Sequence, residues 1–153
     1  MNAKQMTLRL AGDTAYLVAT PPASLFSTFD DNGDGTLSAR EVQRRRANLL
    51  AAFDAALRLV DERGRRGEVI FQDVATAHHH GSEPHLRITF RYRWDTPPAN
   101  LALSYADAER APLRLSAQRA RAARQLGDQV PVGPVFRRTL ALPERVVLFG
   151  GER

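Results

Sequence analysis

Polar and apolar positions alternate at the start of the chain, and the alternation predicts a β-hairpin over residues 7–20. Over residues 7–10, polar side chains alternate with leucines, which is the two-residue period of a strand with one buried face. Gly12 and Asp13 supply a turn signal, and residues 15–19 are rich in β-forming side chains. The proline pair after Thr20 ends the second strand, because proline has no amide hydrogen to donate and suits the first turn of a helix.

Helical spacing follows the hairpin. A short helix is predicted over residues 23–29, where Leu25, Phe26 and Phe29 share one face. An acidic loop comes next, and apolar residues then recur at steps of three, four and seven, which is typical of an amphipathic helix. We predict that this long helix runs from about Ser38 to Arg63. Its apolar stripe comprises Val42, Leu49, Leu50, Phe53, Leu57 and Val60.

Beyond Gly67 the period shortens to two, which predicts strands. Residues 68–77 form one candidate, and the clearest is 86–94, where five large apolar side chains alternate with arginine and threonine. Residues 99–105 alternate again and are predicted to be the antiparallel neighbour of 86–94. The remainder is predicted as a strand at 113–115, a basic helix capped by Ser116 over 116–126, a loop over 127–134, and closing strands over 135–142 and 146–149.

These elements predict an α+β fold, in which an antiparallel β-sheet or sandwich carries a helix–loop–helix unit inserted after the N-terminal hairpin. The 153 residues are expected to form a single domain, because no linker is long enough to separate two. Its parts are the hairpin over 7–20, the helix–loop–helix unit over 22–63 and a mainly β region over 67–150.

The acidic loop between the two predicted helices has the spacing of a calcium site. Residues 30–41 match the pattern D-x-[DN]-x-[DN]-G-x₅-E at every constrained position. Calcium prefers six to eight oxygen ligands, and side chains at alternate positions of such a loop converge on one point. Gly35 permits the sharp turn, and Leu37 is expected to pack inward. The predicted ligands are Asp30, Asn32, Asp34, the backbone carbonyl of Thr36, Ser38 through a water molecule, and Glu41 with both carboxylate oxygens.

On this loop and its flanking residues, the chain resembles the EF-hand calcium-binding superfamily over residues 22–57. The resemblance implies a non-enzymatic calcium-binding module with a single EF-hand. EF-hands usually occur in pairs, and the sequence contains no second motif of this kind. We therefore expect either that two chains pair or that the β region supports the loop. An unpaired hand is expected to bind calcium with a Kd on the order of 10⁻⁵ to 10⁻³ M, which suits a structural site better than a signalling switch.

The order of the parts also resembles the extracytoplasmic EF-hand domain of bacterial hydrogenase- and urease-accessory membrane proteins, and this resemblance implies a link to nickel or cobalt. Histidines occur just before the strand predicted over 86–94. His78 and His80 would share one side of an extended segment, and imidazole binds zinc, copper or nickel. They form a candidate second metal site, and the alternative is a loop of exposed histidines.

Charge is distributed unevenly along the chain. The net charge is +5, and residues 1–41 hold three basic and five acidic residues, so the remainder carries +7, mostly as arginine. Such an excess favours an anionic membrane surface or an acidic protein partner, and the alternative is an arginine-rich solvated surface. Nucleic acid is disfavoured, because the aromatic residues of 86–94 lie on the opposite strand face from its arginines.

No motif of catalysis is present, so we do not expect an enzyme. Cysteine is absent, which excludes disulfides and thiolate metal sites. The first residues lack the apolar segment of a secretory signal, and no apolar stretch is long enough to span a membrane. The chain as written is therefore expected to be soluble, although a trimmed fragment of an extracytoplasmic protein would have the same features.

Overall fold

The alternating N-terminal residues form the predicted hairpin, which lies inside a larger sheet. The computed structural model describes residues 3–30, 37–77, 84–122 and 129–149. In it, β1 (Gln5–Ala11) pairs antiparallel with β2 (Thr14–Ala19) around Gly12, whose φ of 62° lies in the left-handed region that favours glycine. On its other side β1 pairs in parallel with β7 (Leu113–Ala122).

The described strands form two sheets. The larger has six strands in the order β4-β5-β2-β1-β7-β8, and the smaller has three in the order β3-β6-β9. Every pair except β1 with β7 is antiparallel, so the predicted α+β class with mainly antiparallel sheets is confirmed. The other elements are η1 (Ala23–Phe29), α1 (Ala39–Arg44), α2 (Arg46–Ala56), β3 (Leu57–Asp61), β4 (Glu68–Ala77), β5 (His85–Arg93), β6 (Leu101–Tyr105), β8 (Gln129–Leu140) and β9 (Val146–Val147).

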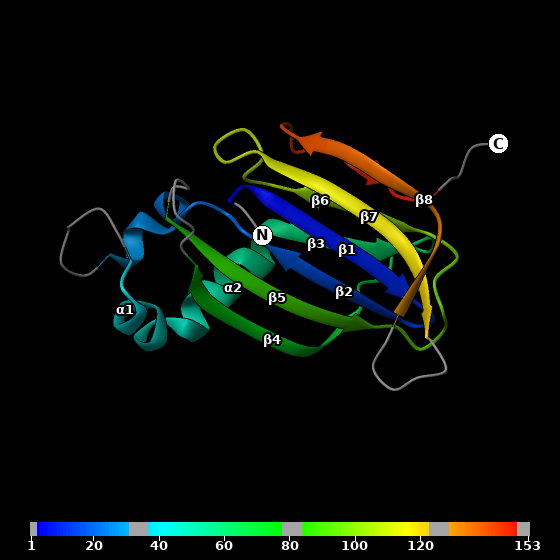
Figure 1. Ribbon diagram of the computed structural model, residues 1–153, viewed down its shortest axis with the longest axis horizontal. Coiled ribbons are helices and arrows are strands. Elements are labelled where there is room, and N and C mark those ends of the chain that lie inside the picture. The colour runs from blue at the N-terminus through cyan, green and yellow to red at the C-terminus, as the bar shows by residue number, and fades with distance from the viewer. Residues whose placement is uncertain (1–2, 31–36, 78–83, 123–128, 150–153) are drawn as a thin grey trace.

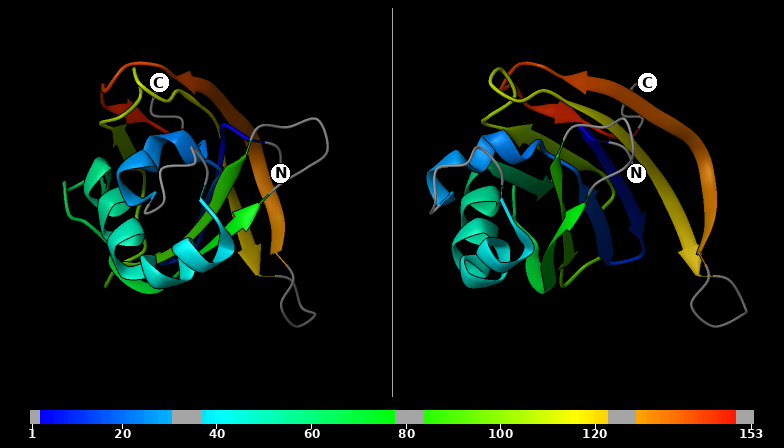
Figure 2. Two further views of the ribbon diagram at one scale, coloured as in Figure 1. Left: turned by 90° about the vertical axis from the view of Figure 1, so that its left-hand side faces the viewer. Right: turned by 60° about the vertical axis from the view of Figure 1, so that its left-hand side comes forward.

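The helices and the smaller sheet cover one face of the six-stranded sheet, and the other face is turned toward the viewer in Figure 1. Figure 2 shows the same arrangement from the side, with α1 and α2 against the inner face. Phe53 of α2 lies at the centre of the core, where its ring contacts Phe26 of η1, Phe90 of β5 and Tyr105 of β6. The core therefore joins the incoming segment of the acidic loop to both sheets.

The long helix predicted from Ser38 to Arg63 is wrong beyond Ala56. Arg45 adopts a turn conformation between α1 and α2, and Leu57 is extended, with φ −114° and ψ 128°. Residues 57–61 form β3, which pairs with β6. The buried helical stripe ends at Phe53, and Leu57 and Leu59 are buried as alternate residues of a strand. A short apolar run fits the period of a helix as well as that of a strand, and the presence of a strand to pair with decides between the two structures.

Three further predictions in the second half are wrong. The strand predicted over 99–105 forms β6, but it pairs with β3 and β9 instead of β5. Residues 116–122 continue strand β7 and do not form a helix capped by Ser116, because β1 and β8 pair with them on both sides. Residues 129–134 belong to β8 and not to a loop. Their prolines are tolerated because β8 is an edge strand of its sheet.

Gly67 lies in the turn between β3 and β4, where the backbone passes close to the core. A Cβ at this position would lie 2.9 Å from Tyr92 Cβ and 3.0 Å from Trp94 Cζ2. We expect Gly67→Ala to lower the free energy of unfolding by about 1–3 kcal/mol, because backbone or ring must move to accept the methyl group. Urea unfolding tests this expectation. Gly64→Ala is the comparison variant, because the strain expected there comes only from a backbone with a positive φ of 78°. Equal midpoints for wild type and Gly67→Ala would contradict the close contact.

Among the described helices, none is long and apolar enough to cross a membrane.

Candidate metal centre

The outgoing side of the acidic loop is built on the first turn of α1. Ser38 is the N-cap residue, and its hydroxyl oxygen accepts a hydrogen bond from the backbone N–H of Glu41 at 3.1 Å. In return, Oε1 of Glu41 accepts the backbone N–H of Ser38 at 2.9 Å. This reciprocal pair is a capping box, which satisfies two amide donors that the start of a helix leaves without partners. The Glu41 carboxylate is thereby held at the beginning of the helix.

Glu41 is a buried acidic residue. It is only 5% exposed, and Leu37 and Val42, which precede and follow it in the sequence, belong to the core cluster. The prediction that Leu37 packs inward is confirmed by its exposure of 9%. A carboxylate this far from water is costly unless charged or polar groups compensate it, and the Ser38 N–H is one such group.

The incoming side of the loop is η1, which spans the predicted residues but is a 3₁₀ helix instead of an α-helix. Phe26 is buried and lies 6.5 Å from Phe53 and 6.5 Å from Phe29, measured between ring centres. Asp30 follows directly, in an extended conformation, and its N–H donates to the Ser27 carbonyl at 3.1 Å. Asp30 is therefore positioned by a short helix that is packed on the core.

The structure places three of the six predicted calcium ligands, Asp30, Ser38 and Glu41. Asn32, Asp34 and Thr36 lie outside the described residues, as do His78 and His80 of the second candidate site. Within the described part of the chain, no group of three or more histidine or acidic residues is close enough to hold a metal ion. Asp73, an acidic residue of β4 near His78 in the sequence, forms an ion pair with Arg46 at 3.4 Å.

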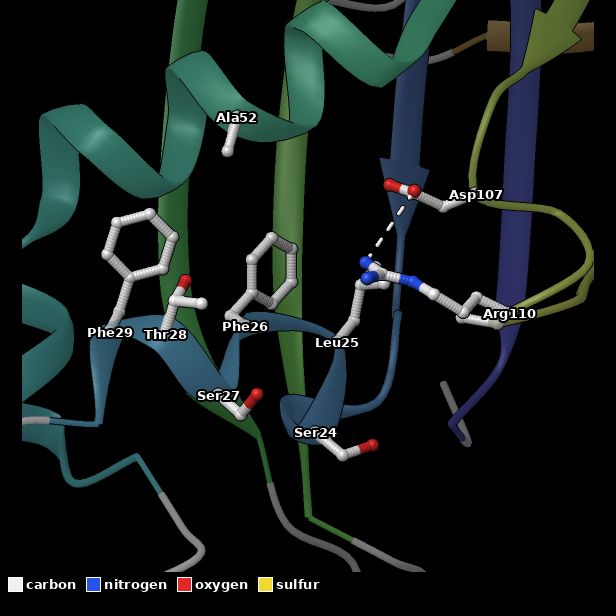
Figure 3. Close-up of a pocket in the computed structure, with 10 residues that line it drawn as sticks. Ser24, Leu25, Phe26, Ser27, Thr28, Phe29, Ala52, Asp107 and Arg110 are labelled. Atoms are coloured by element: carbon white, nitrogen blue, oxygen red, sulfur yellow. Dashed lines mark ion pairs between the residues drawn. The ribbon is translucent and has the colours of Figure 1, made fainter. Parts of the chain in front are cut away.

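A pocket of about 440 Å³ lies beside the incoming segment, and no sequence pattern indicates it. Figure 3 shows η1 along one side, Ala52 of α2 above Phe26 and Phe29, and Asp107 with Arg110 at the opposite end. The Asp107 and Arg110 side chains form an ion pair of 3.6 Å. The pocket is lined by hydroxyl-bearing residues of η1, but its lining has no nucleophile paired with a general base. The lining residues therefore do not indicate a particular reaction.

Comparison with known proteins identified no similar protein. No family model matches the chain, and no curated protein and no solved structure matches it either.

Proposed function

We propose that the chain binds one calcium ion through residues 30–41, as a structural or low-affinity, non-enzymatic site. The observation that carries the proposal is the spacing of oxygen ligands, which ends at Glu41 on the first turn of α1. An acidic loop of solvated residues has no need to bury its last carboxylate. In this chain that carboxylate is 5% exposed and fixed by a capping box.

The chemistry of the ligand set favours calcium over a transition metal. Carboxylate, amide, hydroxyl and carbonyl oxygens are the ligands of a hard cation, and the loop contains no histidine or cysteine. Asp30 and Glu41 lie at the ends of two different elements, η1 and α1. A cation that both carboxylates bind would tie these elements together, and the ion would stabilise the fold at the end of the core formed by Phe26 and Phe53.

Glu41→Gln tests the proposal with little disturbance of the protein. Glutamine can complete a capping box as glutamate does, so the start of α1 is preserved, but it offers calcium one neutral oxygen in place of a charged pair. We expect calorimetric titration of the chelator-treated wild type to show one saturable site. Glu41→Gln should weaken its affinity at least about tenfold, the equivalent of about 1.4 kcal/mol. Glu109→Gln, at an exposed position, should bind as wild type does.

Thermal unfolding supplies a second readout of the same prediction. Saturating calcium should raise the midpoint of wild type, since a ligand at about a hundred times its Kd adds about 2.7 kcal/mol to the stability of the folded state. The midpoint of Glu41→Gln should rise much less. Ser38→Ala removes the side-chain half of the cap and one water-mediated ligand, so it should lower the calcium-free midpoint and reduce the calcium response less than Glu41→Gln does. An identical calcium response in wild type and Glu41→Gln would refute the site.

A further inference from the structure

The uncovered face of the six-stranded sheet is strongly basic. The side chains that alternate with the buried residues of its strands are mostly polar, and six are exposed arginines, none of which forms an ion pair with another described residue. Two carboxylates lie at the β4 edge. Asp73 is paired with Arg46, and Glu68 lies opposite Arg93. The six arginines are Arg9 of β1, Arg87, Arg91 and Arg93 of β5, Arg114 of β7 and Arg137 of β8.

Aromatic rings alternate with arginines in one row across this face. The strand registers place Phe71 of β4 beside Arg91 of β5, Arg91 beside Tyr16 of β2, and Tyr16 beside Arg9 of β1. The guanidinium carbon of Arg91 lies 5.1 Å from the centre of the Phe71 ring and 5.2 Å from that of Tyr16. Such contacts hold a cation in place without neutralising it. Arg91 is therefore an ordered charge that remains available to an anion.

A hollow of about 480 Å³ adjoins this row. Its lining includes Arg9 and Tyr16 of the row together with the side chains of Thr7, Ser116 and Gln118. Arginine and hydroxyl groups are the donors that recognise phosphate oxygens. The hollow is within the size range of small-molecule sites and can accept a phosphate-bearing headgroup.

One end of the row is an exposed ring at the sheet edge. Phe71 of the edge strand β4 is 44% exposed and lies opposite Arg91, so it belongs to the uncovered face. Val69 lies opposite the buried Tyr92 and therefore belongs to the covered face, and Ile70 lies at a register irregularity between Val69 and Phe71. Large apolar residues at an unpaired edge are normally covered or replaced by charges. A partner for this surface must therefore offer an apolar contact to Phe71 beside the anions that the arginines attract.

We propose that this surface, centred on Arg9, Tyr16, Phe71 and Arg91, docks on an anionic lipid bilayer. Arginines near such a bilayer are attracted by its phosphate headgroups, and exposed rings and aliphatic side chains lie at the boundary with the acyl chains. A single-stranded nucleic acid fits less well, because its bases would stack on ring faces that Arg91 already covers, and its backbone offers no apolar phase to the exposed Phe71. The centre of the row is separated from η1 along β5. His85 pairs with Pro22 beside η1, and Arg91 is six residues further along β5, about 20 Å from His85.

Sedimentation with lipid vesicles in the presence of chelator tests the surface independently of calcium. Wild type should bind vesicles of phosphatidylcholine mixed with phosphatidylglycerol, should not bind phosphatidylcholine alone, and should dissociate as salt rises. Arg91→Glu and, separately, Arg9→Glu should each lower the partition coefficient at least about fivefold. Phe71→Ser should lower it severalfold. Matched controls are Arg58→Glu on β3 of the smaller sheet and Leu142→Ser, whose leucine is 53% exposed.

Circular dichroism of each variant checks that it is folded. If Arg91→Glu does not fold, Arg9→Glu still tests the surface, because it leaves the ring contacts of Arg91 in place. Equal losses for Arg58→Glu and Arg9→Glu would overturn the proposal, since only net charge would then matter. So would binding of a fluorescent single-stranded oligonucleotide, abolished by Arg91→Glu, with no binding to vesicles. Vesicle binding that needs calcium would also overturn it, because it would assign the contact to the loop.

Discussion

Replacing Phe53 with alanine is expected to lower the free energy of unfolding by about 3–5 kcal/mol, the range for removing a large aromatic side chain from a core. Phe53 is 1% exposed, and its ring stacks on Phe90 at 6.4 Å with an interplanar angle of 8°. It also contacts Tyr105 at 6.0 Å and Phe26 at 6.5 Å. Because these rings come from both sheets and from η1, a cavity here would loosen the whole support of the acidic loop.

Urea unfolding followed by tryptophan fluorescence measures this change, since Trp94 is buried in the same core cluster. Phe71→Ala is the matched control, because it removes the same atoms from a ring that is 44% exposed, and we expect it to cost about 1 kcal/mol or less. If Phe53→Ala and Phe71→Ala were equally stable, the central position of Phe53 would be wrong. A second consequence of the packing is that Phe53→Ala should also weaken calcium binding, whereas Phe71→Ala should not.

Asp61→Ala is expected to lower the free energy of unfolding by about 2–4 kcal/mol, because hydrogen bonds to a charged acceptor contribute more than neutral ones. The carboxylate is buried at the end of β3. It accepts the backbone N–H groups of Arg63 at 3.0 Å and Arg65 at 2.8 Å, and also Nε of Arg65 at 3.1 Å. The carbonyl of Arg65 in turn accepts Nε1 of Trp94 at 2.9 Å. Asp61 therefore shapes the turn that leads into β4.

The same group makes stability depend on pH. Burial would raise the pKa of Asp61, but the hydrogen bonds from Arg65 and Arg63 and the charge of Arg65 outweigh it, so the pKa lies below its ordinary value. A depressed folded-state pKa means that the stabilisation is complete above the unfolded value of about 3.9 and is lost as pH falls through the folded value. Asp61→Asn cannot titrate. The difference in unfolding free energy between wild type and Asp61→Asn should therefore shrink below about pH 4.

Chemical denaturation at a series of pH values measures that difference. Asp95→Asn, at an exposed position in the loop after β5, is the control and should follow wild type throughout. A difference between wild type and Asp61→Asn that stays constant from neutral to acid pH would show that the carboxylate does not stabilise the turn as an anion.

Strands with a regular alternation could be predicted from the sequence because the signal lies within each strand. The hairpin and the strand β5 follow their patterns, and the buried face of β5 is the one formed by Leu86, Ile88, Phe90 and Tyr92. Residues 57–61 could not be predicted in this way. Their leucines continue a helical stripe, and only pairing with β6, whose partner residues are 40 to 48 positions later, selects the strand. The parallel pairing of β1 with β7 joins residues that are 109 positions apart.

The acidic loop is likewise a local feature. Its ligand spacing is readable in residues 30–41, and the capping box was readable too, since a serine followed three residues later by glutamate is its sequence signal. What the spacing did not reveal is that Glu41 is almost completely buried. Burial depends on how the chain folds around a residue, which the order of neighbouring residues does not contain.

The sequence by itself determined the calcium-loop pattern, the arginine excess and the separation of arginines from aromatic residues within β5, because each depends on the order of neighbouring residues. Only the tertiary structure decided which side chains share a face across strands. The registers bring Tyr16 from β2 and Phe71 from β4 to either side of Arg91, so that aromatic residues accompany the arginines after all. Strand pairing places Tyr16 and Arg91 side by side although they are 75 positions apart in the chain, and no pattern within one strand contains that information.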